Sequence, residues 1–219
     1  MIYKYFYRKE NFFTKDDTMT LFKYIINSSP IGEITIIWRK KPQFQIEEII
    51  ISNPNQTSSQ IAKEKYEKEG ELAINKKSKQ LNNVLKEMNN YFNEKNYRFS
   101  LEYLNLDKLK PFQRAVLEAE FNTEKGTVNT YKDIAKAVNS PKAYRAVGTA
   151  LAKNPFPIII PCHRTVKADR TIGGFSGFAG GLESKKTLLE LDGLMIQGKK
   201  VVGNSPIIAF DKTSQTKLV

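Results

Sequence analysis

The chain contains one cysteine and one histidine, and the two are neighbours, Cys162 and His163. A single thiol cannot form an internal disulfide, so the chain is not one of the small scaffolds that disulfides hold together. One cysteine and one histidine are also too few for a Cys/His-rich zinc site, and we expect no bound metal. A Ser-His-Asp hydrolase would have to use this one histidine. The fold must therefore depend on hydrophobic cores, and thiol or imidazole chemistry is confined to one place.

The composition indicates a globular protein with a basic surface. The 219 residues suit one or two domains, and 40% of them are hydrophobic. We expect no membrane partner, because the sequence lacks the run of about 18 apolar residues that a transmembrane helix needs. The first residues have no apolar stretch and no small-residue cleavage site, so they do not resemble a signal peptide. We expect a cytoplasmic protein, at the nucleoid or in a nucleus, whose net charge of +12 suits a polyanionic partner.

The first half, residues 1–106, is predicted to be a small α/β domain, with residues 1–20 left undecided. Runs of β-branched residues predict strands, and apolar residues at helical spacing predict a helix. No catalytic constellation is visible in this half. The expected elements are a strand over 31–38, its hairpin partner over 44–51, a polar and partly helical stretch over 53–80, a helix over 81–92 and a strand over 99–104.

The second half, residues 107–195, is predicted to be mostly helical, with residues 196–219 as a tail. Pro111 suits the first turn of a helix over 112–121, and a last helix is expected over 182–192. Thr130 is expected to cap one helix, and Ser140 to cap the next after a three-residue turn. Two helices so joined, at about 130–152, predict a helix-turn-helix, with an ordinary αα-hairpin as the alternative. From 125 to 170, nine cations and two anions give a net charge of +7, which favours nucleic acid.

The ordinary interpretation of a lone cysteine is an inert core residue. Two features of Cys162 favour a reactive thiol instead. It follows a stiff apolar segment bracketed by prolines, and its neighbours His163 and Arg164 are expected to lower its pKa. His163 can take the thiol proton only if the chain turns or a water bridges. Asp192 lies at a helix C-terminus, where an anion is disfavoured, so we expect a cationic partner for it; an exposed, unpaired Asp192 is the alternative.

A family resemblance is carried by the run Asn154-Pro155-Phe156-Pro157-Ile158-Ile159-Ile160-Pro161-Cys162-His163-Arg164. It resembles the signature of the O6-alkylguanine-DNA alkyltransferases, also called methylated-DNA–protein-cysteine methyltransferases. The resemblance covers roughly residues 110–193, while residues 31–51 are only faintly similar. It implies a two-domain α+β protein, with a ribonuclease H-like N-terminal domain and a helix-turn-helix in the C-terminal domain. Further matches are Phe112–Val116, Thr130–Ala135, Arg145–Gly148, Gly177–Leu182 and Leu188–Gly193.

The resemblance implies direct reversal of DNA damage by a methyltransferase that works once, as a monomer and without a cofactor. The alkyl group of O6-alkylguanine, or of O4-alkylthymine, in double-stranded DNA would pass irreversibly to Cys162 after base flipping. The catalytic residues would be Cys162, His163, Asp192 and Asn154. The DNA-binding residues would be Gln113, Tyr131, Lys132, Ser140, Ala143, Arg145 and Arg164. The substrate pocket would be formed by Tyr131, Pro157, Phe178, Ala179 and Gly180.

The sequence departs from the family pattern at two points. Asp192 stands where the family usually has glutamate, and Tyr144 is bulkier than the usual residue. Three other functions compete with DNA repair. They are a non-catalytic helix-turn-helix protein that binds alkylated DNA as a lesion sensor, a Cys-His hydrolase and a thiol redox sensor.

Overall fold

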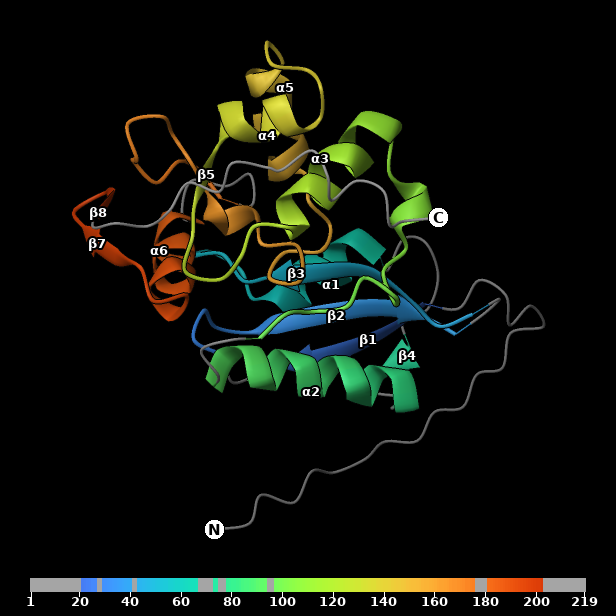
Figure 1. Ribbon diagram of the computed structural model, residues 1–219. Coiled ribbons are helices and arrows are strands. Elements are labelled where there is room, and N and C mark those ends of the chain that lie inside the picture. The colour runs from blue at the N-terminus through green and yellow to red at the C-terminus, as the bar shows by residue number, and fades with distance from the viewer. Residues whose placement is uncertain are drawn as a thin grey trace.

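The computed structural model describes residues 21–26, 29–40, 43–66, 73–74, 78–93, 97–175 and 181–202. Its first part combines a sheet with two helices (Figure 1). The elements are β1 (Leu21–Ile26), β2 (Ile34–Arg39), β3 (Gln45–Ile51), α1 (Ser58–Tyr66), β4 (Ala73–Ile74) and α2 (Lys79–Asn93). Their order confirms the predicted hairpin and the predicted helix over 81–92, and α1 supplies the helical part of the polar stretch.

The four strands form one sheet in the order β3-β2-β1-β4. β2 pairs antiparallel with both β1 and β3, and β4 pairs parallel with β1. The predicted strand over 99–104 is wrong: these residues form turns and join the sheet only through a bridge between Ile46 and Leu104. The backbone hydrogen bond from Leu104 N to Leu101 O, at 3.0 Å, closes a turn, and an extended strand cannot form this bond.

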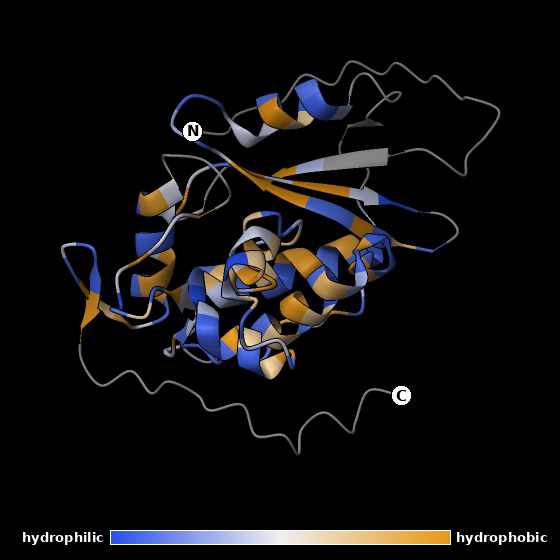
Figure 2. Ribbon diagram, turned by 90° about the horizontal axis from the view of Figure 1, so that it is seen from above, coloured by the Kyte–Doolittle hydropathy of each residue, from blue (hydrophilic) through white to orange (hydrophobic). Residues whose placement is uncertain are grey.

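Both faces of the sheet are covered, because β2 and β3 carry apolar residues on both sides (Figure 2). On one face, Ile37 and Ile50 pack against Ala62 of α1. On the other face, Ile36 and Ile49 belong to a larger core that also contains α2 and the helices of the second half. Because this core includes residues from both halves of the chain, the sheet supports the second half directly.

The second half is mainly helical and agrees with the mixed α and β fold predicted from the sequence. Figure 1 shows α3, α4 and α5 grouped on the opposite side of the molecule from α2. Two short strands, β5 and β6, pair in parallel between these helices and α6. The elements are η1 (Leu106–Lys108), α3 (Pro111–Phe121), β5 (Asn129–Thr130), α4 (Tyr131–Ala137), α5 (Tyr144–Ala152), η2 (Cys162–Arg164), β6 (Thr165–Val166), α6 (Gly181–Leu191), β7 (Met195–Gln197) and β8 (Lys200–Val202).

The start of α4 was predicted correctly, and the start of α5 was not. Thr130 and Asp133 form a capping box at α4. The expected three-residue turn with Ser140 as the next cap is wrong, because α5 begins at Tyr144 and its N-cap is Ala143. Asn139 adopts a positive φ of 54°, which ends α4, and a further turn follows from Ser140 to Ala143 before α5 starts.

The hairpin of β7 and β8 packs on a smaller core, which consists of residues that precede α6, belong to α6 and follow α6 in the sequence. Val201 is buried there with Val128 and Leu189. Residues 195–202 therefore belong to the packed structure, whereas residues 203–219 lie outside the described residues. All helices in the described ranges are too short or too polar to cross a lipid bilayer.

Candidate active site

Cys162 is placed by a rigid segment that runs from the end of α5 to η2. Ile158, Ile159 and Ile160 are buried as predicted, and Ile158 has a positive φ of 76°. The backbone N–H of Ile49 in β3 donates to Pro155 O at 2.8 Å, which fixes this segment to the edge of the sheet. The segment that carries the thiol is therefore fixed by its buried isoleucines and by its hydrogen bond to β3.

Asn154 connects this segment to the thiol. Its Nδ2 donates to Ile160 O at 2.9 Å and contacts Cys162 Sγ at 3.2 Å. Its Oδ1 accepts from Phe156 N at 2.9 Å. The Asn154 side-chain amide thus binds backbone groups at the start and at the end of the segment. It thereby fixes the position of the sulfur atom and offers it a hydrogen-bond donor.

The chain turns at Cys162, as a Cys-His pair in consecutive positions requires. Residues Cys162–Arg164 form the short helix η2, and all three are buried. His163 Nε2 lies 3.1 Å from Asp192 Oδ2 and 3.3 Å from the hydroxyl of Tyr91. With Nε2 donating to Asp192, Nδ1 is the basic nitrogen, and it has no hydrogen-bond partner among the described residues.

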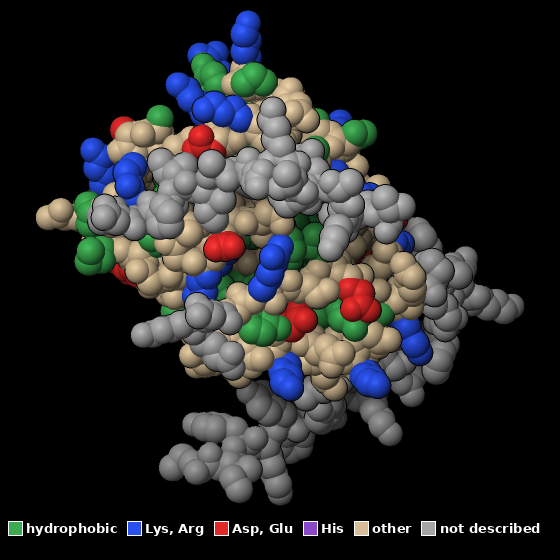
Figure 3. All heavy atoms as spheres, viewed as in Figure 1, with side chains coloured by type: hydrophobic (Ala, Val, Ile, Leu, Met, Phe, Trp, Pro, Cys, Tyr) green, Lys and Arg blue, Asp and Glu red, His purple; other side chains and the backbone are tan. Residues whose placement is uncertain are grey.

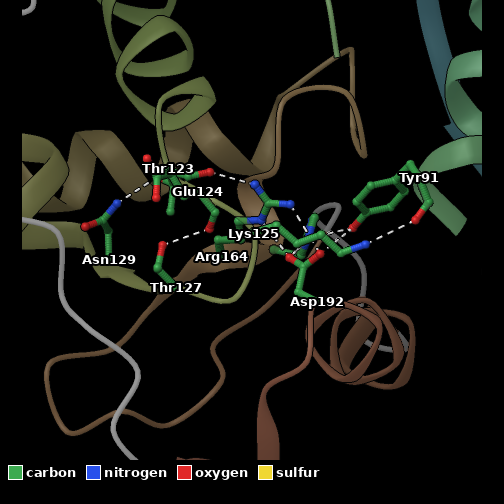
Figure 4. Close-up of polar contacts among 9 residues, drawn as sticks. Tyr91, Thr123, Glu124, Lys125, Thr127, Asn129, Arg164 and Asp192 are labelled. Atoms are coloured by element: carbon green, nitrogen blue, oxygen red, sulfur yellow. Dashed lines mark hydrogen bonds and ion pairs between the residues drawn. The ribbon is translucent and has the colours of Figure 1, made fainter. Parts of the chain in front are cut away.

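Asp192 is the centre of a buried polar network rather than an exposed carboxylate (Figure 4). Arg164 donates from Nε to Oδ2 at 2.6 Å, and the Tyr91 hydroxyl donates to Oδ1 at 3.0 Å. The prediction that Asp192 has a cationic partner is thus confirmed. Lys125 extends the network, since its Nζ lies 3.2 Å from Tyr91 O and 4.7 Å from the centre of the Tyr91 ring.

Sequence reasoning missed Tyr91, which α2 of the first half supplies to this site. Its hydroxyl is buried, and a buried tyrosine hydroxyl needs a polar partner. Burial, followed by the Asp192 charge, raises the pKa of Tyr91, so the hydroxyl stays protonated as a donor. No local pattern in the sequence connects Tyr91 with a motif about 70 residues further along the chain.

The electrostatics of the network keep His163 neutral. Burial lowers the pKa of His163, although the hydrogen bond and charge of Asp192 oppose that shift. Burial alone would raise the pKa of Asp192, but its contacts with His163 and Arg164 outweigh burial and hold it well below the usual range. At neutral pH the site therefore contains an Arg164–Asp192 ion pair and an uncharged imidazole.

The expectation that the neighbours of Cys162 lower its pKa is wrong. Burial raises the pKa of Cys162 to about 11, while the Asn154 hydrogen bond opposes this rise. His163 is uncharged, and the Arg164 guanidinium is bound to Asp192 and to Thr123 O. The resting side chain is consequently a thiol, and a base is needed to make it a nucleophile.

Tyr131 lies beside the thiol because the pairing of β5 with β6 brings the start of α4 to the end of η2. Its ring packs against Gly148 and Gly173, where a Cβ atom would come within 3.7 Å and 2.9 Å of the tyrosine. Glycine at position 173 thus leaves room for the Tyr131 hydroxyl. Pro157 is buried in the segment before the thiol, whereas Phe178, Ala179 and Gly180 lie outside the described residues.

The surface of α4 and α5 is basic (Figure 3). Of the residues predicted to bind DNA, Lys132 and Arg145 are exposed there, while Ser140 and Ala143 are half-buried in the connection between the helices. Tyr144, which is bulkier than the usual residue, begins α5 and is 40% exposed. The other exposed cations of this surface are Lys136, Lys142 and Lys153.

Two residues predicted to bind DNA have side chains that bind other parts of the protein. Gln113 donates from Nε2 to Lys153 O at 2.9 Å and so ties α3 to the end of α5. Arg164 is buried with Asp192. In the described ranges, no group of three or more His, Cys, Asp or Glu side chains is arranged to hold a metal ion.

A family model described as 6-O-methylguanine DNA methyltransferase, DNA binding domain, matches residues 111–194. This range contains α3 to α6, Cys162 and the polar side chains of the site other than Tyr91. The chain is thus defined as an α/β protein whose helical part is of this domain class. More particularly, the chain is similar to methylated-DNA–protein-cysteine methyltransferases, and the resemblance seen in the sequence is confirmed.

Individual relatives agree with this resemblance. A methylated-DNA–protein-cysteine methyltransferase of Haemophilus influenzae is 48% identical over 88 residues, which cover 38% of this chain and 48% of that protein. The match thus spans about half the length of this curated relative. The crystal structure of Mycobacterium tuberculosis O6-methylguanine methyltransferase covers 79% of this chain and 93% of its own, with 26% identity and a TM-score of 0.63. The crystal structure of the O6-methylguanine-DNA methyltransferase from Pyrococcus kodakaraensis matches 80% of this chain and 100% of its own chain, with 29% identity and a TM-score of 0.59.

Proposed function

We propose that this protein repairs double-stranded DNA by moving the alkyl group of O6-alkylguanine onto Cys162. One observation carries the proposal: the only thiol of the chain is held by Asn154 next to a neutral His163 that Asp192 orients. This arrangement is that of an activated nucleophile, with a base and a group that orients the base. The domain limits, 1–106 and 107–195, belong to the same proposal.

The buried residues can perform the chemistry in one displacement. His163 Nδ1 takes the thiol proton through a water, and Asp192 with Arg164 and Tyr91 stabilises the imidazolium. The thiolate attacks the alkyl carbon, so that the S–C bond forms while the bond from that carbon to O6 breaks. The electron pair of the broken bond leaves with guanine, which is then protonated. Because the resulting thioether is stable, each molecule reacts once and needs no cofactor.

DNA would be bound by the basic surface of α4 and α5. The thiol is only 6% exposed, so it cannot reach an alkyl group inside a base stack, and the damaged nucleotide must rotate out of the duplex. Arg145, exposed at the second position of α5, is suited to fill the vacated space. Tyr131, packed on Gly148 and Gly173, is suited to contact the rotated nucleotide. In this proposal α4 and α5 act as a helix-turn-helix and the protein works as a monomer.

Intact-mass measurement tests the proposal. After incubation with a duplex that contains O6-methylguanine, the protein should gain the mass of one methylene group, once per chain. Cys162→Ser should gain nothing. Tight binding of the lesion duplex without a mass gain would refute repair and support the lesion-sensor alternative.

A further inference from the structure

A second polar cluster, which the proposed chemistry does not use, lies beside Cys162. Glu120 of α3 and Lys185 of α6 are 0% and 1% exposed. Thr165 connects them: its hydroxyl donates to Glu120 Oε2 at 2.5 Å, and its carbonyl oxygen accepts from Lys185 Nζ at 2.6 Å. Thr165 directly follows η2, and α3 and α6 both contact η2. The carboxyl and the ammonium group therefore flank the turn that carries the thiol.

Both charged side chains have unused hydrogen-bonding capacity. Glu120 Oε1 is buried and has no hydrogen-bond partner among the described residues. An ammonium group has three N–H donors, and in the described part of the chain the acceptor for Lys185 is Thr165 O alone. A bare buried carboxylate oxygen is costly, so this position favours a protonated carboxyl group. The cluster can therefore hold a proton at Glu120 and stabilise a neighbouring anion through Lys185.

The two charges act on the thiol in opposite directions. The Glu120 carboxylate raises the pKa of Cys162, and the Lys185 ammonium lowers it. Burial raises the pKa of Glu120 to about 7 and lowers that of Lys185, whereas a Cys162 thiolate and the Glu120 carboxylate oppose the shift at Lys185 and favour its charged form. Two anions cannot form cheaply in one buried site. The charged and polar groups that face Glu120 are Thr165, Arg164, Lys185, Cys162 and Tyr131.

We propose that Glu120 and Lys185 are positioning residues that control the ionisation of Cys162, with Glu120 protonated and Lys185 charged when the thiolate forms. The inference deepens the function proposed above, and its relevance to alkyl transfer rests on that function. Where Glu120 starts as a carboxylate, it takes up one proton from the solvent and forms an O–H bond, while the S–H bond of Cys162 breaks and that proton goes to His163, so the site gains one proton in all. The negative charge of the cluster thus moves from the Glu120 carboxylate to the Cys162 thiolate. The Lys185 ammonium group stays charged throughout.

The presence of one cysteine makes the ionisation directly measurable. Protein labelled with 13C at the cysteine β-carbon gives a single NMR signal, from Cys162, whose shift reports thiol and thiolate. We expect Glu120→Gln to lower the titration midpoint by about one pH unit and Lys185→Met to raise it by about as much. The matched controls are Glu118→Gln on α3 and Lys186→Met on α6, which should leave the midpoint unchanged.

Alkyl transfer provides the second readout. At a fixed pH of about 8, where most Glu120 carboxyl groups are ionised, Glu120→Gln should react with an O6-methylguanine duplex several times faster than the wild type, and Lys185→Met several times slower. Circular dichroism verifies folding, and if Lys185→Met does not fold, the double variant Glu120→Gln/Lys185→Met should titrate near the wild-type midpoint.

Opposite shifts support the inference. Shifts of both variants in the same direction, or none, overturn it, even if the wild type repairs DNA. If the midpoints shift as expected but the wild-type protein takes no methyl group from the duplex, the proposed function fails instead, and the coupling remains a property of the thiol alone.

Discussion

Arg164 donates two hydrogen bonds to Asp192, from Nε to Oδ2 at 2.6 Å and from Nη2 to Oδ1 at 3.2 Å. Such a two-pronged contact between guanidinium and carboxylate is among the strongest that side chains make. It fixes the carboxylate while Oδ2 also faces His163. The shorter side chain at position 192 therefore still reaches the imidazole, although the family usually has glutamate there.

Replacing Asp192 with Asn should destabilise the fold and slow alkyl transfer. The substitution leaves the Arg164 charge buried without its partner, which typically costs about 3–5 kcal/mol. Urea denaturation should show a lower midpoint, and intact-mass kinetics a slower transfer. Glu190→Gln, two residues earlier on the exposed side of α6, is the matched control. Wild-type stability in Asp192→Asn would mean that the ion pair contributes nothing to the fold.

The free energy of unfolding should depend on pH through two buried carboxyl groups, Asp192 and Glu120, whose contributions change in opposite directions as the pH rises. The pKa of folded Asp192 lies below the unfolded value of 3.8, so its contribution is present above about pH 4 and is lost as the pH falls further. The pKa of folded Glu120, about 7, lies above the unfolded value of 4.5, so its contribution is present in acid and is lost as the pH rises between these values. Urea denaturation at a series of pH values should show that Glu120→Gln removes this second decline. A profile parallel to the wild type would contradict the prediction.

Tyr91→Phe should reduce both stability and transfer rate modestly. The substitution removes one hydroxyl donor from Asp192 and keeps the aromatic ring, so the loss of stability should be about 1 kcal/mol. Transfer should slow by less than in Asp192→Asn, because Arg164 still holds the carboxylate. Tyr97→Phe, a half-buried tyrosine of the same half, provides the comparison. Faster transfer by Tyr91→Phe would show that the hydroxyl opposes the reaction.

Arg145→Ala should separate DNA handling from chemistry. Arg145 is exposed on α5 and its side chain takes no part in the hydrogen bonds of the buried network, so its loss should slow repair of a duplex far more than reaction with the free base O6-benzylguanine. Lys186→Ala, on α6, serves as the surface control. Equal losses with both substrates would assign Arg145 a structural role. Binding of the wild type to DNA should also weaken linearly on a logarithmic salt scale, as expected for phosphate contacts.

Local signals made much of the fold predictable. The helix over 81–92, the hairpin of β2 and β3, and the capping box at Thr130 all follow from residues close in sequence. The predictions failed where the backbone departs from local pattern. Asn139 takes a positive φ and delays the start of α5, and a turn that ends at Leu104 replaces the strand predicted over 99–104.

The candidate site was predictable only in part. The motif around Cys162 and the anion at 192 indicated a relay, because both carry chemistry in their residue types. Burial could not be judged from the sequence, and it reverses the expected shift of the Cys162 pKa. Tyr91, Glu120 and Lys185 come from three helices, and only the packing of these helices brings them near the thiol.

Burial of Cys162 has a consequence for the proposed function, in which each molecule reacts once. Oxidation or alkylation of the sulfur by another reagent would inactivate the whole molecule, because the chain has one cysteine. Because the sulfur is protonated at rest and shielded from solvent, it is a poor target for such reagents, which attack the thiolate. Under the proposed function, the burial that makes activation of the thiol dependent on a base would also preserve the thiol until a damaged base is bound.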